Sequence, residues 1–227
     1  MTRPYDLLIF DWDGTLADSA AAIVDGMQRA IVQLGLPKRT DEQIRDKIGL
    51  GFGDAVTRLF PELQAAEIIG LLQGYRQHLL AGGRDGGGPA EAPLFPGALD
   101  ALRALAGAGY RIAVATGKSR GSLERSLKTH AALRELLSSS RCADETASKP
   151  DPLMLRELLE EEDVAPSRAL MVGDTEFDVA MACAARVPAV GVVCGVHEPE
   201  RLVQAGALAL IEAVPQLPEW LERKVER

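Results

Sequence analysis

Residues 7–16 read Leu-Leu-Ile-Phe-Asp-Trp-Asp-Gly-Thr-Leu, a short apolar run that ends on two acidic residues. The run at 7–10 predicts a strand buried on both faces, as in parallel sheets, and Gly14 ends it. If the chain stays extended, the Asp11 and Asp13 side chains point to the same side. Two carboxylates held close together usually bind a cation, or one of them keeps its proton. At this point a capped turn into a following helix is an equally good interpretation, because Asp and Gly are also common turn residues.

The composition is that of a globular protein. With 227 residues, of which 47% are hydrophobic and 26% charged, the chain can bury one large domain or a core with a modest insertion. No apolar run approaches the ~20 residues of a membrane helix, and residues 1–6 lack the apolar stretch of a secretory signal. We therefore expect a soluble, cytoplasmic protein without a membrane partner. The net charge of −8 disfavours nucleic acid, whose phosphates select basic patches.

The three cysteines, Cys142, Cys183 and Cys194, are widely spaced and form no Cys-x-x-Cys pair. This spacing argues against a disulfide framework and against a thiolate zinc site. We expect reduced, largely buried thiols. Nothing in the sequence fixes the oligomeric state.

Residues 18–93 carry helical patterns and no strand pattern. Helices are expected at 18–34, with Asp18 as the N-cap, and then from Thr40 or Asp41 through Ile48, at 56–60 and at 63–80. The glycine-rich stretch 82–89 predicts a flexible surface loop. This is too much helix for a simple crossover between two strands, so we expect an inserted helical domain beside the core.

From residue 96 onward, helical and strand patterns alternate, which is typical of a parallel sheet. Strands are expected at 111–115, 139–142, 169–172, 189–193 and 208–211, and helices at 98–108, from 119, at 152–162, around 179–182, near 201 and around 220. The predicted fold is therefore an α/β, doubly wound (Rossmann-like) parallel-sheet core, residues 1–17 and 94–227, with residues 18–93 inserted. In such sheets, ligands bind at the carboxyl ends of the strands, near the point where the strand order reverses.

Polar residues follow the strongest predicted strands. Asp11 and Asp13 follow the first, Thr116-Gly117-Lys118 the second, and Gly173-Asp174 leads on to Asp178 after the run at 169–172. Lys149 lies in the segment 148–152, where Pro150 and Pro152 fix a turn into the next helix and stiffen the backbone that carries its amine. All of these groups would meet on one rim of the sheet.

Oxygen ligands without a histidine favour a hard cation such as Mg²⁺ over zinc. A lysine and a hydroxyl beside such an ion suit a phosphoryl group, because they offset the repulsion between phosphate and an attacking carboxylate. That attack would give an acyl phosphate on an aspartate. The rim therefore predicts Mg²⁺-assisted phosphoryl transfer.

Four motifs together carry a resemblance to a known family. They are Asp11-x-Asp13-Gly14-Thr15, Thr116 at a strand end, Lys149-Pro150, and Gly173-Asp174-x-x-x-Asp178. In order and spacing they resemble the haloacid dehalogenase superfamily of phosphohydrolases, over nearly the whole chain and including a helical cap between the first and second motifs. Residues 10–16 and Phe95-Pro96-Gly97 are similar to phosphoglycolate phosphatase-like members.

The resemblance implies a role for each matched residue. Asp11 would be the nucleophile and a Mg²⁺ ligand, and Asp13 would protonate the leaving oxygen and then activate water, with its backbone carbonyl on the metal. Thr116, Gly117 and Lys149 would hold the transferring phosphoryl group. Asp174 would bind the metal, and Asp178 would bind it or orient its surroundings. The implied substrate is a small phosphorylated metabolite such as 2-phosphoglycolate.

Asp13 also separates the chemistries of this superfamily. A dehalogenase has no leaving alcohol to protonate and lacks an acid at this position, so a phosphatase is favoured. A phosphomutase and a catalytically silent binding protein are the alternatives. Gly49-x-Gly51-x-Gly53 follows a helix, so it is not a dinucleotide fingerprint. As a cap loop it lacks the Arg that sugar-phosphate mutases tend to carry there, which argues against a mutase.

Several charged residues have two possible roles. Lys118 is expected either to touch the substrate or to be solvated, and Arg58 and Arg76 are the cap cations that could contact a substrate carboxylate. Asp151 and Glu176 are expected to be helix-start acids, favoured by the helix dipole. Of the histidines, His78 and His130 are expected to be structural. His197, in a loop after a strand, is a weaker candidate for the site.

Overall fold

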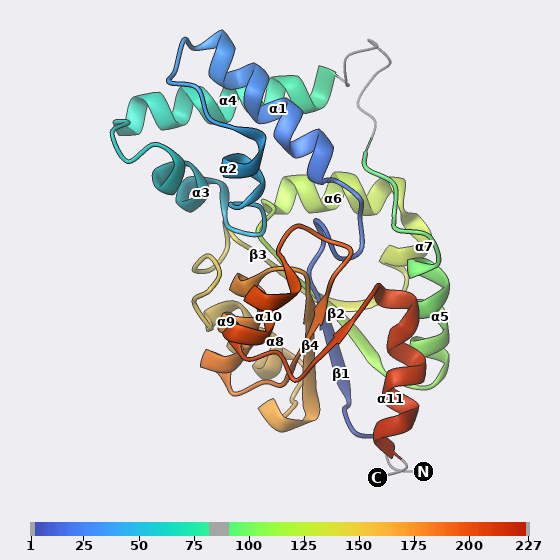
Figure 1. Cartoon of the computed structure of the whole chain (residues 1–227). Coiled ribbons are helices and arrows are strands. Elements are labelled where there is room, and N and C mark those ends of the chain that lie inside the picture. Colours follow the sequence, from blue (N-terminus) through green and yellow to red (C-terminus); the bar gives the residue numbers. More distant parts are fainter. Residues whose placement is uncertain (1–2, 82–90, 226–227) are drawn as a thin grey trace.

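A six-stranded parallel sheet forms the centre of the computed structural model, which describes residues 3–81 and 91–225 (Figure 1). The strands are β1 Leu7–Phe10, β2 Arg111–Thr116, β3 Leu137–Cys142, β4 Ala169–Gly173, β5 Ala189–Val192 and β6 Ala209–Ile211. Their order is β3-β2-β1-β4-β5-β6, and every neighbouring pair is parallel. The order reverses between β1 and β4. This confirms the predicted α/β, doubly wound fold.

Helices cover both faces of this sheet. One face carries α5 Ala98–Gly107, α6 Arg120–Thr129, α7 Ala131–Arg134 and α11 Leu217–Val225. The other carries α8 Leu153–Glu161, α9 Glu176–Ala185 and α10 Pro199–Ala205. In β1, Leu8 and Phe10 join the first cluster and Leu7 and Ile9 the second, all fully buried. Burial on both faces explains the continuous apolar run in the sequence.

Four helices lie beyond the carboxyl ends of β1 and β4 and share a hydrophobic cluster of their own (Figure 1). They are α1 Ala20–Gln33, α2 Asp41–Arg45, α3 Phe52–Leu59 and α4 Ala65–Ala81. The two segments that join these helices to the sheet run side by side. Ala17 forms an isolated β-bridge with Leu94, and the Asp18 N–H donates to the Pro93 carbonyl at 2.9 Å. The division at residues 17/18 and 93/94 stays a prediction.

Several expected helix limits were wrong. The first helix is capped at Ser19 instead of Asp18, whose backbone is used by the crossing to Pro93. Helix α2 begins after its Thr40 capping box but ends at Arg45, with Asp46 in a turn. Helix α3 begins at Phe52, four residues before the expected start, and α7 was not anticipated. The predicted loop at 82–89 lies outside the described residues.

The expectation of largely buried thiols was also wrong for two of the three cysteines. Cys142 is buried at the end of β3, whereas Cys183 and Cys194 are exposed. Cys183 lies on the exposed side of α9, and Cys194 lies in the loop that follows β5. Of the described helices, none combines the length and apolarity needed to cross a bilayer.

Candidate active site

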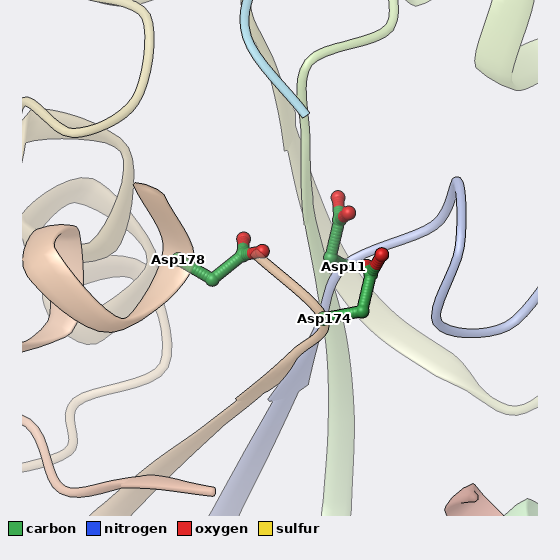
Figure 2. Close-up of side chains that lie close together, drawn as sticks. All are labelled: Asp11, Asp174 and Asp178. Atoms are coloured by element: carbon green, nitrogen blue, oxygen red, sulfur yellow. The ribbon is translucent and has the colours of Figure 1, made fainter. Parts of the chain in front are cut away.

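Three buried carboxylates, those of Asp11, Asp174 and Asp178, converge at the carboxyl ends of the central strands (Figure 2). One oxygen of each lies within 4.8 Å of the others. Asp11 follows β1, and Asp174 follows β4. These two strands are neighbours, with Phe10 opposite Val172, and the Asp11 N–H donates to the Val172 carbonyl at 2.9 Å. The cluster therefore lies at the point where the strand order reverses.

Asp178 comes from the first turn of α9 and reaches the cluster from the side (Figure 2). It closes a capping box with Thr175: the Asp178 N–H donates to Thr175 Oγ1 at 3.3 Å, and the Thr175 N–H donates to Asp178 Oδ2 at 3.1 Å. The Thr175 hydroxyl donates to the same Oδ2 at 2.6 Å. This box uses Oδ2 and leaves Oδ1 facing Lys149. The spacing Asp174-x-x-x-Asp178 thus joins a strand end to the following helix N-terminus.

The Lys149 ammonium lies between two of the acids. Its Nζ is 2.6 Å from Asp11 Oδ1 and 2.6 Å from Asp178 Oδ1, and all three side chains are buried. Burial acts to lower the pKa of Lys149, but the charges of Asp11 and Asp178 outweigh it and raise that pKa above its ordinary value. The lysine therefore stays charged in a site where water does not solvate it.

One ammonium does not neutralise three carboxylates. Burial raises the pKa of Asp11 well above its usual range against the opposing charge of Lys149, and Asp178 and Asp174 raise it further. Burial raises the pKa of Asp174 to about 7, and the Asp178 charge adds to the shift. The site therefore favours any added positive charge, whether a proton or a cation.

Hydrogen bonds fix the Asp174 side chain. Thr15 Oγ1 donates to Asp174 Oδ1 at 2.8 Å, and the Val196 N–H donates to Oδ2 at 2.9 Å. A Cβ on Gly14, whose φ is +87°, would lie 2.2 Å from Asp174 Oδ2, so only glycine fits this turn. The glycine in the first motif therefore makes room for an acid that lies 160 positions further along the chain.

The residues fit a hard divalent cation. All three cluster side chains offer oxygen, and Asp11 Oδ2 is buried without a hydrogen-bond partner among the described residues. A buried orphan carboxylate oxygen is costly unless something binds it. The sequence led us to expect that Asp13 binds the metal through its backbone carbonyl. Its carboxylate is not part of this cluster.

The Asp13 carboxylate has different neighbours. Its Oδ1 accepts hydrogen bonds from Ser19 Oγ at 2.7 Å and from Lys118 Nζ at 3.2 Å. The two aspartates of the first motif therefore have separate environments: Asp11 faces Lys149 and the acidic cluster, and Asp13 faces Lys118. Of the two roles expected for Lys118, simple solvation is wrong, since 84% of its side chain is covered and its amine is paired.

The end of β2 supplies the remaining predicted residues. Thr116 is fully buried, and its Oγ1 accepts the Lys118 N–H at 3.2 Å. Gly117 lies directly under the loop between α2 and α3, because a Cβ there would be 2.5 Å from the carbonyl oxygens of Gly49 and Leu50. The same loop is tied to the core near Lys149, where the Gly51 N–H donates to Ser148 Oγ at 2.8 Å. The helical insertion is thus closed over the strand ends.

A cavity of about 520 Å³ lies between the insertion and the core. Asp11, Asp13, Gly117 and Lys118 line its core side, and residues of all four insertion helices line the other. Of the two cap cations singled out in the sequence, Arg76 lines the cavity, whereas Arg58 lies over the Phe177 ring at 5.5 Å. A cavity that is partly open to solvent therefore adjoins the two aspartates of the first motif.

His197 lies beside the site in a contact between core and insertion. Its Nδ1 accepts the Glu176 N–H at 3.1 Å, and its Nε2 donates to the Asp46 carbonyl at 3.3 Å. Arg201 joins the same contact through ion pairs with Glu176 and Asp46. Glu176 is therefore an acid at the start of α9, as expected, and it also helps to hold the insertion.

The other residues singled out in the sequence lie away from the cluster. Asp151 is exposed and accepts the Leu153 N–H at the start of α8. His130 Nε2 bonds the Ala92 carbonyl at 3.0 Å, and His78 bonds Gln33 at 2.8 Å, so both histidines have structural partners.

Sequence reasoning missed the residues that hold the acids in place. Thr15 and Thr175 stand inside recognised motifs, and an S/T-x-x-D box at 175–178 was available as a signal. Ser19 and Val196 carry no such signal, because their contacts with Asp13 and Asp174 depend on chain segments meeting in space.

Comparisons with known proteins agree with this geometry. A family model described as haloacid dehalogenase-like hydrolase matches residues 8–192. The chain is 33% identical to the phosphoglycolate phosphatase of Rhodospirillum rubrum, covering 94% of this chain and 90% of that protein. It is 32% identical to the phosphoglycolate phosphatase of Cupriavidus necator, and the match covers 97% of this chain and 95% of that protein. A haloacid dehalogenase-like hydrolase structure from Bacteroides fragilis matches with a TM-score of 0.84 at 27% identity, covering 94% of this chain and 99% of that one.

The chain therefore belongs to the haloacid dehalogenase-like hydrolase family. Within it, the chain falls in the phosphoglycolate phosphatase-like branch, and its enzyme class is that of the phosphoric monoester hydrolases. The resemblance stated from the four motifs is confirmed.

Proposed function

We propose that the protein is a Mg²⁺-dependent phosphatase that hydrolyses a small phosphate monoester through a phospho-aspartyl intermediate on Asp11. The observation that carries this proposal is the Asp11 carboxylate itself. Its Oδ1 is held by Lys149, while its Oδ2 is buried and without a hydrogen-bond partner among the described residues. A carboxylate fixed by one oxygen, with the other free, is prepared for attack on phosphorus.

The two steps divide between the two aspartates of the first motif. The Asp11 carboxylate forms a bond to phosphorus as the ester P–O bond breaks, and Asp13 gives its proton to the leaving alcohol oxygen. Asp13 then takes a proton from water, whose oxygen attacks the same phosphorus and releases phosphate and the free Asp11 carboxylate. Ser19 and Lys118 hold Asp13 in position. Thr116, Gly117 and Lys149 hold the transferring phosphoryl group.

Asp11, Asp174 and Asp178 would hold the Mg²⁺, together with the backbone carbonyl of Asp13. Their buried oxygens and the raised pKa values of Asp11 and Asp174 support this assignment. When bound, the ion offsets the negative charge of the carboxylates and of the phosphoryl group.

We assign residues 18–93 as a cap and residues 1–17 with 94–227 as the catalytic core. The contacts of Gly117 with the 49–50 loop and of Gly51 with Ser148 support a cap that closes over the reaction. Closure of this kind excludes bulk water during transfer to Asp11. The names of the relatives make 2-phosphoglycolate the first substrate to test.

A phosphomutase and a silent binding protein are the competing functions. Purified protein is assayed for phosphate release from an aryl phosphate and from a panel of phosphate esters, with Mg²⁺ and with EDTA. We expect release that EDTA abolishes. Absence of release across the panel would remove the hydrolase proposal, and transfer between two positions of one sugar phosphate would favour the mutase.

Two variants test the assigned roles. Asp11→Asn is expected to abolish turnover with the fold intact, while Asp151→Asn, at an exposed acid, keeps the wild-type rate. Asp13→Asn is expected to lose turnover and to keep most of its metal affinity, measured by calorimetry. A wild-type rate in either site variant would contradict the role assigned to that residue.

A further inference from the structure

The cavity described above is far more apolar on its cap side than the chemistry at its floor requires. The cap side is formed by side chains from all four helices of the cap and from the 46–51 loop. Seven of them are Ile23, Met27, Ile44, Ile48, Phe52, Leu72 and Leu79. Polar lining residues lie on the core side, where Lys118, Ser119 and Ser122 line the cavity together with Asp11 and Asp13. The cap side is thus the more apolar of the two, although Lys47, Asp54, Tyr75 and Arg76 also line it.

Part of this apolar surface lies outside the buried cluster of the cap. Met27, Ile44 and Ile48 belong to the buried cluster of the cap, but Leu72 and Leu79 line the cavity without belonging to it. Both leucines are half-buried. Apolar surface that is left facing a cavity, rather than packed in a core, gains free energy when a ligand covers it.

The size of the cavity points the same way. The cavity has a volume of about 520 Å³ in this structure, in which the 49–50 loop of the cap lies directly against Gly117. Pockets of roughly 300–1,000 Å³ hold drug-sized ligands. A two-carbon acid on a phosphoryl group would leave most of this space filled with water against isoleucine, leucine and methionine side chains.

The cations of the cap do not offset this preference. Lys47 lines the cavity but is paired with Asp46. Arg76 lines it as well but is exposed, where pairing with a substrate carboxylate contributes little. The cap is therefore poorly equipped to select a small anionic leaving group by charge.

We propose that the preferred substrate is a phosphate monoester whose alcohol carries an apolar body larger than glycolate, with the phosphoryl group at Asp11 and that body against the Leu72 and Leu79 side of the cap. This inference rests on the proposed phosphatase function. It makes 2-phosphoglycolate a poorer substrate than an ester of longer, apolar alcohol.

The test is a series of ethyl, butyl and hexyl phosphate, compared with 2-phosphoglycolate at saturating Mg²⁺. For the wild-type protein we expect kcat/KM to rise two- to fourfold per added methylene, since burying one CH2 contributes roughly a fourfold change in an equilibrium constant. Hexyl phosphate should exceed 2-phosphoglycolate. A flat or falling series, with 2-phosphoglycolate preferred, overturns the inference.

A matched pair of variants locates the effect. Leu72→Gln places an amide in the apolar surface of the cavity and should flatten the series, whereas Val32→Gln changes a residue of α1 that is 74% exposed and should keep the slope. An unchanged slope in Leu72→Gln also overturns the inference.

Binding separates this inference from the proposed function. The Asp11→Asn variant should bind hexyl phosphate more tightly than ethyl phosphate in calorimetry, by on the order of tenfold or more. Turnover of all esters with no dependence on chain length contradicts the inference alone. Absence of turnover for every ester contradicts the phosphatase function, and equal binding of the two alkyl phosphates then removes the inference as well.

Discussion

Lys149 Nζ lies 2.6 Å from Asp11 Oδ1, although 138 positions separate the two residues along the chain. The same ammonium is 2.6 Å from Asp178 Oδ1, and neither pair is exposed to water. Lys149 is therefore the positive charge around which the buried acids are arranged. Most of the consequences that can be measured depend on this balance of one cation against three carboxylates.

Replacing Lys149 by an uncharged side chain of similar length should stop the reaction. In Lys149→Met, Asp11 loses the partner that holds its Oδ1, and the transferring phosphoryl group loses a positive charge. We expect kcat to fall by at least about 100-fold, the effect typical of losing one preorganised charge or donor in a transition state. Steady-state kinetics with an aryl phosphate measure it. Lys128→Met, at an exposed residue of α6, is the control. A kcat within a few-fold of wild type would contradict the role of Lys149.

The acidic cluster predicts how stability depends on pH without metal. The folded-state pKa of Asp174 is about 7, against an ordinary value of 3.8, so between these values the folded protein holds a proton that the unfolded chain has released. Its contribution to stability is therefore full below pH 4 and is lost as pH rises through 7. The pKa of Asp11 is raised in the same direction.

Denaturant unfolding in EDTA at pH 5 to 8 measures this effect. The free energy of unfolding of the wild type, relative to Asp174→Asn, should decrease as pH rises. Mg²⁺ should restore more stability at pH 8 than at pH 5, because at pH 5 it competes with protons for the same oxygens. If the wild type gained stability relative to Asp174→Asn over this range in EDTA, the assignment of these pKa shifts would be wrong.

Gly117 offers a direct test of cap closure. A Cβ at this position would lie 2.5 Å from the Gly49 and Leu50 carbonyl oxygens, so Gly117→Ala should push the cap loop away from the core. We expect activity to fall at least about tenfold, because a displacement of about 1 Å at a reacting site can cost up to 100-fold in rate. Gly121→Ala is the matched control, since its Cβ would meet nothing nearer than 4.0 Å. Equal activities of the two variants would show that the closed loop is not needed.

Lys118 is expected to act on the reaction through Asp13. Its Nζ is 3.2 Å from Asp13 Oδ1, so Lys118→Met removes the charge that positions this carboxylate. We expect kcat to fall by about 10- to 100-fold with KM little changed, because a displaced Asp13 transfers protons less efficiently. A variant that raised only KM would show instead that Lys118 binds substrate and does not position Asp13.

The architecture could be predicted because each of its elements depends on local pattern. The apolar runs at 7–10 and 169–172 are buried on both faces of the sheet. A continuous apolar run bounded by turn residues is sufficient to identify such a strand. The acids at strand ends followed from the rule that ligands bind at the carboxyl edge. Lys149 could be placed on this rim from the proline-stiffened turn that carries it, but nothing local reveals that its amine reaches Asp11.

What the sequence could not supply depends on segments that meet in space. The N-cap of the first helix is Ser19 because the Asp18 backbone is hydrogen-bonded to Pro93, a contact between residues 75 positions apart. Ser19 then turns toward Asp13, and Val196 toward Asp174. The apolar cap side of the cavity is equally invisible in the sequence, because residues such as Ile23 and Leu72 show the same helical periodicity whether they face a core or a cavity.

The most direct test of the account is to identify the residue that carries the phosphoryl group during turnover. The protein is mixed with a phosphate ester and Mg²⁺, quenched in acid within milliseconds and reduced with borohydride, which converts an acyl phosphate to the alcohol. Peptide mapping by mass spectrometry should then find the Asp11 side chain reduced to that of homoserine, in wild type and not in Asp11→Asn. Reduction at a different residue, or phosphate release with no reduced residue at any quench time, would contradict Asp11 as the nucleophile.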